Sequence, residues 1–152
     1  YFVKAFKKRW YVVAYSPGTD DIRCYALDRM ENVIISDKVF KMPKDLEPAE
    51  YFKDCFGIIN NKDSEAQKVV LKVDAFQSNY IRNLPLHESQ KEMKRTDEYS
   101  IFEYHLKPEF DFEQEIFFNM DTMEVLEPQW LREEVSERLR NLAKKYKICP
   151  SS

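Results

Sequence analysis

Aromatic and β-branched residues alternate with polar turns over the first forty residues of the chain. Phe2 to Phe6 and Arg9 to Tyr15 fit two antiparallel strands joined around Lys7-Lys8. Ile22 to Leu27 and Asn32 to Ser36 continue the meander. Four short strands so close together predict a small, strongly bent sheet or barrel.

A helix and a polar linker follow this strand-rich part. Pro48 is tolerated in the first turn of a helix, and an apolar stripe at helical spacing continues from it to Gly57, which suits a C-terminal stop. Residues 60–65 are polar and rich in turn formers, so we place a domain boundary there. The apolar stripe of the predicted helix consists of Tyr51, Phe52, Cys55 and Phe56.

The remaining pattern predicts the order βαββαβ. Residues 69–73 alternate as a strand, and Asp74 stands where an N-cap would start a helix bearing Phe76, Tyr80 and Leu84. Two strands over 89–96 and 99–106 come next. The second of them has Phe102, Tyr104 and Leu106 on one face and Tyr99, Ile101 and His105 on the other.

A second helix, a last strand and a final helix complete this order. Phe112, Ile116 and Met120 recur at helical spacing, and residues 123–126 form a short strand stopped by Pro128. With right-handed crossovers, βαββαβ gives a ferredoxin-like sandwich of a four-stranded sheet and two helices. The final helix carries one apolar stripe, made of Leu131, Val135, Leu139, Leu142 and Tyr146.

Composition points to an ordered protein inside the cell. The chain has 152 residues, of which 43% are apolar and 14% aromatic, enough for one ordinary domain or two small ones. Its apolar runs are far shorter than the roughly 20 residues that cross a bilayer, and no secretory signal opens it. We therefore expect a soluble, cytoplasmic protein that makes no membrane contact.

The cysteines favour free thiols over a metal site. Cys24, Cys55 and Cys149 are odd in number and widely spaced, and only His87 and His105 could assist them as ligands. A structural zinc site needs about four clustered ligands. We expect no metal and no cofactor, with reduced thiols in a reducing compartment.

Charge is distributed unevenly along the chain. Residues 1–44 hold nine Lys or Arg and five Asp or Glu, a net charge of +4, so the rest carries −7 to reach the overall −3. An anionic partner would therefore meet the first part of the chain. Ordinary solvated charges are the alternative, and we prefer it for Lys38, Lys41 and Lys44.

Motifs of enzymatic chemistry are missing from the sequence. With only Gly18 and Gly57, the chain has no glycine-rich phosphate loop, and it has neither a nucleophile elbow nor a histidine-rich metal motif. Asp28, His87 and His105 are the residues that a catalytic domain would use. We interpret Asp28 as a structural or ion-paired residue and His105 as a satisfied or half-exposed side chain, and expect no catalytic residues.

Basic and aromatic residues interleave on the second and third predicted strands. Guanidinium groups bind phosphate or carboxylate, and aromatic faces stack on bases or rings. Strand alternation puts Trp10 on one face, which we expect to be core, and Arg9 with Tyr11 on the other, facing a site. The alternative is aromatic core residues with arginines extending to solvent. The predicted ligand-binding residues are Arg9, Tyr11, Arg23, Tyr25 and Arg29.

Two segments of these strands resemble the WYL domain family. Arg9-Trp10-Tyr11-Val12-Val13 resembles its Trp-Tyr-Leu signature, with Val12 in the Leu place. Residues 23–30, Arg-Cys-Tyr-Ala-Leu-Asp-Arg-Met, resemble its Arg-x-Phe/Tyr-x-Leu-Asp-Arg-Ile strand, with Met30 in the Ile place. Matched by motif position, Tyr11, Arg23 and Arg29 correspond to the family's proposed ligand site, and Arg9 lies beside the signature.

The resemblance implies a domain plan and a function. WYL domains are small Sm-like or SH3-like barrels found in bacterial transcriptional regulators, between a DNA-binding helix-turn-helix and a C-terminal extension named WCX. Residues 1–59 would be a WYL-like barrel, and residues 66–150, with Val125-Leu126-Glu127-Pro128 before the last helix, would be a ferredoxin-like WCX domain with an extra C-terminal helix. The fold class expected is therefore α+β.

This plan carries expectations about partners. The chain opens on Tyr1-Phe2-Val3 inside an apolar strand, so we expect the barrel to lack its first strand, which an upstream segment or a partner chain would supply. Double-stranded DNA would be bound only through an upstream domain. The region itself would bind an anionic effector, a nucleotide or oligonucleotide, and form a homodimer. The alternative from another class is a module that binds single-stranded nucleic acid directly.

Overall fold

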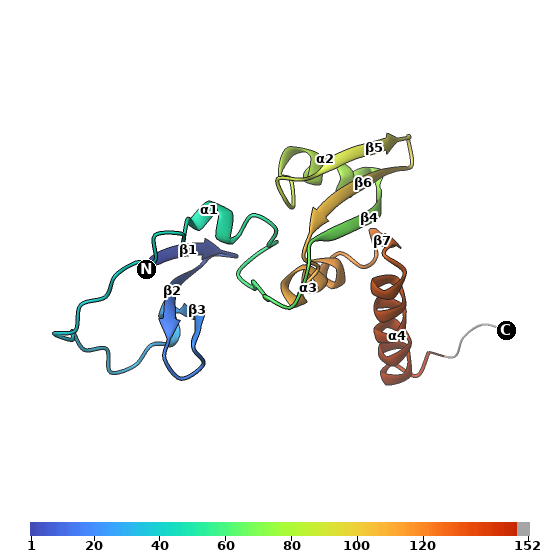
Figure 1. Cartoon of the computed structure of the whole chain (residues 1–152). Helices are drawn as coiled ribbons and strands as arrows, with labels where there is room; N and C mark the ends of the chain where they lie inside the picture. Colours follow the sequence, from blue (N-terminus) through green and yellow to red (C-terminus); the bar gives the residue numbers. More distant parts are fainter. Residues whose placement is uncertain (149–152) are drawn as a thin grey trace.

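Residues 1–148, which the computed structural model describes, form a mixed α+β arrangement with two antiparallel sheets (Figure 1). We call residues 1–59 the first unit and residues 66–148 the second unit. In chain order the elements are β1 (Phe2–Phe6), β2 (Arg9–Ser16), β3 (Asp21–Ala26), the 3-10 helix η1 (Leu27–Arg29), α1 (Pro48–Tyr51), β4 (Gln67–Asp74), α2 (Ala75–Asn83), β5 (Lys91–Arg95), β6 (Tyr99–Leu106), α3 (Phe110–Phe118), β7 (Met123–Glu127) and α4 (Gln129–Lys145). Across the described residues, no helix is both long and apolar enough to span a bilayer.

The first sheet is an antiparallel meander in the order β1-β2-β3. Its first hairpin turns at Lys7 and Lys8, as predicted, with φ angles of 46° and 63°. A two-residue hairpin of type I′ needs this left-handed backbone at both positions, which costs about 1–2 kcal/mol for each residue with a Cβ. The two lysines therefore occupy a strained turn that contacts elsewhere must stabilise.

The prediction of a fourth strand over residues 32–36 is wrong. This segment lies in a wide loop between η1 and α1, where Val33, Ile34 and Ile35 are almost fully exposed (Figure 1). The 3-10 turn of η1 directs the chain away from β3 before a further strand can pair. Within residues 1–148 the first sheet consequently stays open and does not close into a barrel.

Helix α1 is shorter than the predicted helix, ending at Tyr51 instead of Gly57. Beyond it, the backbone forms hydrogen bonds with the second unit: the Lys107 N–H donates to the Asp54 carbonyl over 2.7 Å. Phe52 and Cys55 still turn inward and pack on Val13, the fully buried centre of the first sheet. The predicted apolar stripe is thus buried by a compact loop.

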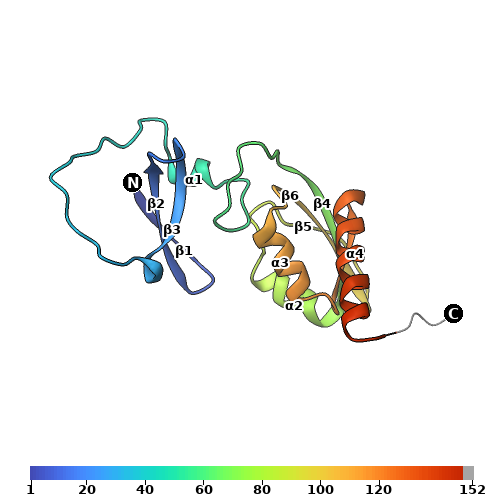
Figure 2. The same cartoon turned by 90° about the horizontal axis from the view of Figure 1, so that it is seen from below.

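The second unit has the predicted element order and a sheet ordered β5-β6-β4-β7, with every pair antiparallel. Alternate residues of β4 and β6 are buried, and β6 buries the predicted face with Phe102, Tyr104 and Leu106. Helices α2 and α3 lie on the same side of this sheet (Figure 2). The core beneath the helices comprises Val69, Leu71, Val73, Ile81, Phe102, Tyr104, Leu106, Phe112, Ile116, Met123, Val125 and Leu131.

Helix α2 is rotated relative to the predicted apolar stripe. Asp74 is the N-cap, as predicted, and its Oδ1 accepts a hydrogen bond from the Gln77 N–H over 2.7 Å. Ser78 and Ile81 face the sheet, and the Ser78 hydroxyl donates a hydrogen bond to the Val73 carbonyl of β4. The apolar residues that marked this helix in the sequence, Phe76, Tyr80 and Leu84, are therefore exposed.

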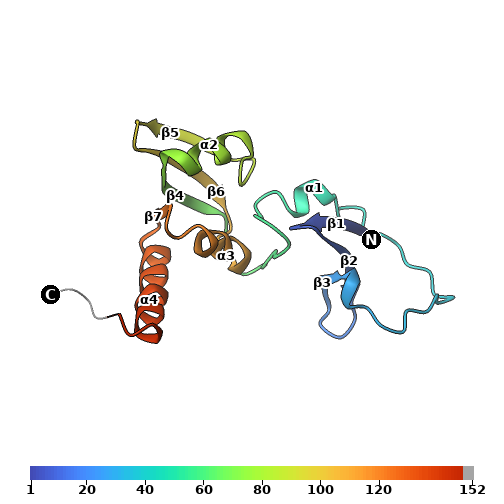
Figure 3. The ribbon, with the colours of Figure 1, turned by 180° about the vertical axis from the view of Figure 1, so that it is seen from behind.

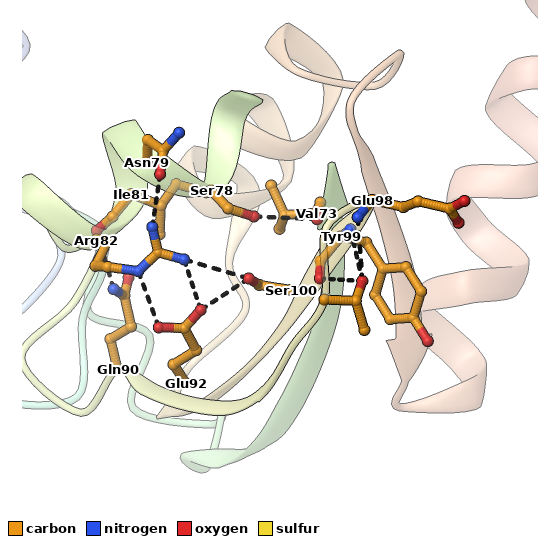
Figure 4. Close-up of polar contacts among 11 residues, drawn as sticks. Val73, Ser78, Asn79, Ile81, Arg82, Gln90, Glu92, Glu98, Tyr99 and Ser100 are labelled. Atoms are coloured by element: carbon orange, nitrogen blue, oxygen red, sulfur yellow. Dashed lines mark hydrogen bonds and ion pairs between the residues drawn. The ribbon is translucent and has the colours of Figure 1, made fainter. Parts of the chain in front are cut away.

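Arg82 ties α2 to two strands of the sheet (Figure 4). Its guanidinium donates two hydrogen bonds to the Glu92 carboxylate, at 2.9 and 2.6 Å, and others to Asn79 and Ser100. These donors hold the pKa of Glu92 at about 2, since they stabilise the ionised carboxylate. The exposed, highly polar β5 is attached to the helix layer by this network.

The two units meet along a contact that we call the joint, formed by residues 54–59 and residues 107–115. Asp111, at the start of α3, accepts hydrogen bonds from the Ile58 and Ile59 N–H groups over 2.9 and 3.2 Å. Burial raises the pKa of Asp111, although these donors oppose the shift. Gly57 passes so close to Asp111 that a Cβ there would lie 2.5 Å from its Oδ2.

The apolar residues of helix α4 pack on the core of the second unit only in the first half of the helix. Leu131 is fully buried and Val135 packs on the core, whereas Leu139, Leu142 and Tyr146 are substantially exposed. The Arg138 guanidinium forms an ion pair with the Glu113 carboxylate of α3, with Nη2 and Oε2 2.8 Å apart. The rest of the helix extends beyond the β7 edge of the sheet (Figure 3). Residues 149 and 150, the last two assigned to the second domain and including Cys149, lie outside the described residues.

Candidate functional site

The register of the first sheet separates the predicted ligand-binding residues onto two faces. Residues paired across antiparallel strands share a face, and the face changes at each step along a strand. Val13, which packs on α1, pairs with Cys24, so Arg9 and Tyr11 share this inner face. Arg23 pairs with Ala14 and Tyr25 with Val12, on the outer face.

The outer face carries Trp10, so its prediction as a core residue is wrong. Trp10 is 56% exposed and Tyr25 is 42% exposed. Helix α1 and the segment after it cover the opposite face, because that face holds Val13 and its neighbours. The outer face thus presents two aromatic rings and the Arg23 guanidinium to solvent, while Arg29 lies in η1.

A pocket of about 590 Å³ lies at the tip of the first hairpin, and we call it the hairpin pocket. Arg9 and Tyr11 are the predicted site residues that line it. Three consecutive cations, from Lys7 to Arg9, reach it from the strained turn. Its full lining comprises Phe6, Lys7, Lys8, Arg9, Trp10, Tyr11, Leu27 and Asp28.

Lys7 and Lys8 are the site residues that sequence reasoning missed. The strand pattern predicts only a hairpin turn at these two lysines, although their position next to Arg9 makes three cations in a row. A two-residue hairpin loop brings both lysines to the same end of the sheet as Arg9. Adjacency in sequence was therefore the signal that could have identified them.

Carboxylates already hold two of the pocket's cations. Arg9 Nε lies 3.0 Å from Asp28 Oδ2, and Lys7 Nζ lies 2.8 Å from Glu115 Oε2 on α3. Both arginine and lysine side chains are roughly half exposed. An exposed ion pair such as Arg9–Asp28 contributes at most about 1 kcal/mol, and Lys7 is itself half exposed, so an external anion can compete for these cations.

A second pocket, of about 620 Å³, lies between β3, α1 and the segment leading to β4. Arg23 lines it, but Asp20, Asp21 and Glu109 also do, and Lys62 forms an ion pair with Asp21. The hydrogen bond from Lys62 lowers the pKa of Asp21. The mixed charge of this second pocket suits an anion less well than the charge of the hairpin pocket does. Tyr25 and Arg29 line neither of the two pockets.

Two of the three candidate catalytic residues, Asp28 and His87, make structural contacts. Asp28 pairs with Arg9, and the His87 Nε2–H donates to the Lys53 carbonyl over 2.9 Å. The Ser89 hydroxyl oxygen lies 2.8 Å from His87 Nδ1. The hydrogen bond to that nitrogen comes from the Ser89 backbone N–H, however, and the Ser89 hydroxyl donates to the His105 carbonyl. The serine proton is thus directed away from the imidazole.

The thiols of the half-buried Cys24 and the buried Cys55 are not activated. Burial raises the pKa of Cys24, and it raises the pKa of Cys55 to about 11, so both thiols are protonated at neutral pH. In residues 1–148, no three His, Cys, Asp or Glu side chains group closely enough to hold a metal ion.

Comparison with known proteins adds two domain matches. The family model of the WCX domain matches residues 65–143, and that of the WYL domain matches residues 1–35. The first match covers β4 through most of α4, and the second covers the whole first sheet with η1. No curated protein matches the chain.

Proposed function

Because this chain belongs to the WCX domain family and begins with a WYL domain match, we propose that it is the effector-sensing and oligomerisation region of a WYL-type transcriptional regulator. Both domains belong to regulatory families rather than to enzyme families. Residues 1–59 then form the WYL-like domain, an incomplete Sm-like barrel, and residues 66–150 the WCX-like domain. The sheet order β5-β6-β4-β7 supports a ferredoxin-like assignment of the latter.

The hairpin pocket carries this proposal. It joins three cations with Trp10 and Tyr11, a combination that suits a nucleotide or a short oligonucleotide, because phosphates attract the cations and bases stack on the rings. An effector acts on transcription only if it binds two arrangements of the regulator unequally. DNA binding itself is assigned to another domain of the regulator.

The five predicted ligand-binding residues divide between two regions of this sheet. Arg9 and Tyr11 contact any ligand held in the hairpin pocket. Arg23 and Tyr25 lie on the outer face, and Arg29 lies in η1 next to the pocket residues Leu27 and Asp28. An oligonucleotide that continues from the pocket onto the outer face would contact them, whereas a mononucleotide would not.

Fluorescence anisotropy with a labelled oligothymidylate of about ten nucleotides tests this division. We expect Arg9→Ala to weaken binding about tenfold or more, since it removes a charge-assisted contact and leaves Asp28 unpaired in the pocket. Arg23→Ala and Arg29→Ala should weaken oligonucleotide binding while leaving mononucleotide binding unchanged. Arg140→Ala, on α4, removes the same charge and serves as the control. Equal affinities of the Arg9 and Arg140 variants would remove the hairpin pocket from the site.

A second candidate function is direct binding of single-stranded nucleic acid as the region's own activity. The exposed rings of Trp10 and Tyr25 on the outer face favour it, because open aromatic surfaces stack bases without sequence preference. Several phosphate contacts would give a steep loss of affinity with added salt, and a small effector a shallow one. A salt titration of the same anisotropy signal separates the two functions.

The homodimer is proposed on the exposed apolar residues of α2 and of its C-cap, Leu84. Phe76, Tyr80 and Leu84 recur along one face of the helix and are open to solvent. A two-fold axis beside α2 would bury this stripe against its own copy. Light scattering of Tyr80→Glu should then report a monomer. A dimer that persists in this variant excludes α2 as the interface.

A further inference from the structure

Lys7 belongs to two parts of the molecule at once. It lines the hairpin pocket, and its Nζ lies 2.8 Å from Glu115 Oε2 in the second unit. The lysine side chain is 47% exposed, whereas that of Glu115 is 18% exposed. The cation is therefore accessible to a ligand while the carboxylate that holds it is mostly enclosed.

Phe6 makes a second connection between the pocket and the joint. It lines the hairpin pocket, and its ring packs edge-on against Phe56 with centroids 5.6 Å apart. Phe56 in turn packs on Phe112 of the second core, at 5.4 Å. A Cβ at Gly57 would lie 2.5 Å from the Phe6 ring, so this side of the ring is closely packed.

Helix α3 contacts the first unit through two carboxylates on one face. Asp111 and Glu115 are one turn apart, at i and i+4, and so point to the same side. Asp111 holds the backbone of Ile58 and Ile59, and Glu115 holds Lys7. The first carboxylate binds groups that no anion can remove, and the second binds a cation that an anion in the pocket would attract.

We propose that Glu115 is an internal competitor for Lys7, so that an anion bound in the hairpin pocket takes Lys7 from Glu115 and weakens the hold of α3 on the hairpin. This inference rests on the proposed function, because it requires an anion in that pocket. Binding and the joint are then linked reciprocally: whatever breaks the Lys7–Glu115 contact raises affinity for the anion. The strained turn at Lys7 and Lys8 loses a stabilising contact in the same step.

Equilibrium binding of the labelled oligothymidylate, at a salt concentration of about 50 mM, tests the competition. Glu115→Gln should bind about two- to fivefold more tightly than the wild type, the range expected for a partly exposed ion pair. Glu115→Asp keeps the charge but draws it back from Lys7, so it should also bind more tightly. If only the Gln variant gains affinity, net charge explains the result and the inference is wrong.

A double-mutant cycle supplies the decisive control. In a Lys7→Gln background, Glu115→Gln should have no effect on oligonucleotide affinity, because the contact that it removes is already absent. An undiminished effect in that background overturns the inference. Wild-type protein that binds no oligonucleotide overturns the proposed function itself, which keeps the two failures distinct.

Hydrogen exchange gives a readout at the joint that does not depend on affinity. The Ile58 and Ile59 amides donate to Asp111, next to Glu115 on α3. Saturating oligonucleotide should speed their exchange if ligand binding loosens this contact. Unchanged exchange of both amides in the wild-type protein contradicts the linkage even if the affinities follow the pattern above.

Discussion

Replacing Gly57 with alanine tests the packing of the joint directly. The new Cβ would lie 2.5 Å from Asp111 Oδ2 and 2.5 Å from Phe6 Cζ, whereas carbon atoms in contact are usually about 3.5 Å or more apart. Asp111 and Phe6 would each have to retreat by about 1 Å. No left-handed backbone is required at this glycine, so space alone decides the effect.

The retreat is costly because neither neighbour is free. Asp111 Oδ2 accepts from the Ile58 and Ile59 N–H groups, and lengthening those bonds loses part of about 1 kcal/mol each. Phe6 is backed by the Phe56 ring. With overpacking costs of about 1–3 kcal/mol, we expect Gly57→Ala to lower the free energy of unfolding by about 2–3 kcal/mol.

Urea unfolding followed by tryptophan fluorescence measures this change. Trp10 lies in the first sheet and Trp130 in α4, so replacing either one by phenylalanine leaves a single reporter on one unit. The midpoint should fall by about 1 M, given a typical slope for a protein of this size.

Gly18→Ala is the matched control, since no atom lies within 4 Å of a Cβ at that turn. It should be neutral or stabilise the protein by up to about 1 kcal/mol through the unfolded chain. Two alanine variants with the same midpoint would refute the close packing at Gly57.

Three further predictions concern the second unit and the buried thiol. Glu92 has a folded pKa of about 2, below its usual value, so its stabilising contribution is complete above about pH 4.5 and is lost as the pH falls toward 2. The melting temperature of the wild type should therefore fall more than that of Glu92→Gln between about pH 5 and pH 3. Parallel curves of melting temperature against pH would contradict this. Asp74→Ala should cost about 1 kcal/mol in thermal unfolding by removing the α2 N-cap, and an unchanged melting temperature would rule the cap out. With the other cysteines replaced by alanine, Cys55 should react with a disulfide reagent at mildly alkaline pH only after urea unfolding, since burial raises its pKa to about 11; rapid reaction of the folded protein would show an accessible thiol.

Strand positions were predictable wherever one face of a strand is buried by its own unit. β4 and β6 alternate cleanly because each lies between two partners and beneath helices, and the Asp74 cap is a local signal. The apolar residues Phe76, Tyr80 and Leu84 misled because the face of α2 that packs on the sheet carries Ser78 and Ile81 instead. Periodicity records spacing but not which face is covered.

The candidate site was predictable only in part, for a related reason. Sequence alternation placed Arg9 and Tyr11 together, and the structure has them on one face and in one pocket. It could not decide the pairing register between β2 and β3, which puts Arg23 on the opposite face from Arg9. Nor could it reveal that Lys7 contacts Glu115, since that pair depends on how two units meet.

The wide loop between η1 and α1 has a practical consequence. It carries Lys38 and Lys41 in fully solvated backbone, so trypsin should nick the folded chain there before any other region. The fragment bearing the first sheet would stay attached through the contact of Val13 with Phe52 and Cys55. A clipped but associated form would let the sheet be exchanged for an isotopically labelled copy, so that its ligand contacts could be observed free of signals from the second unit.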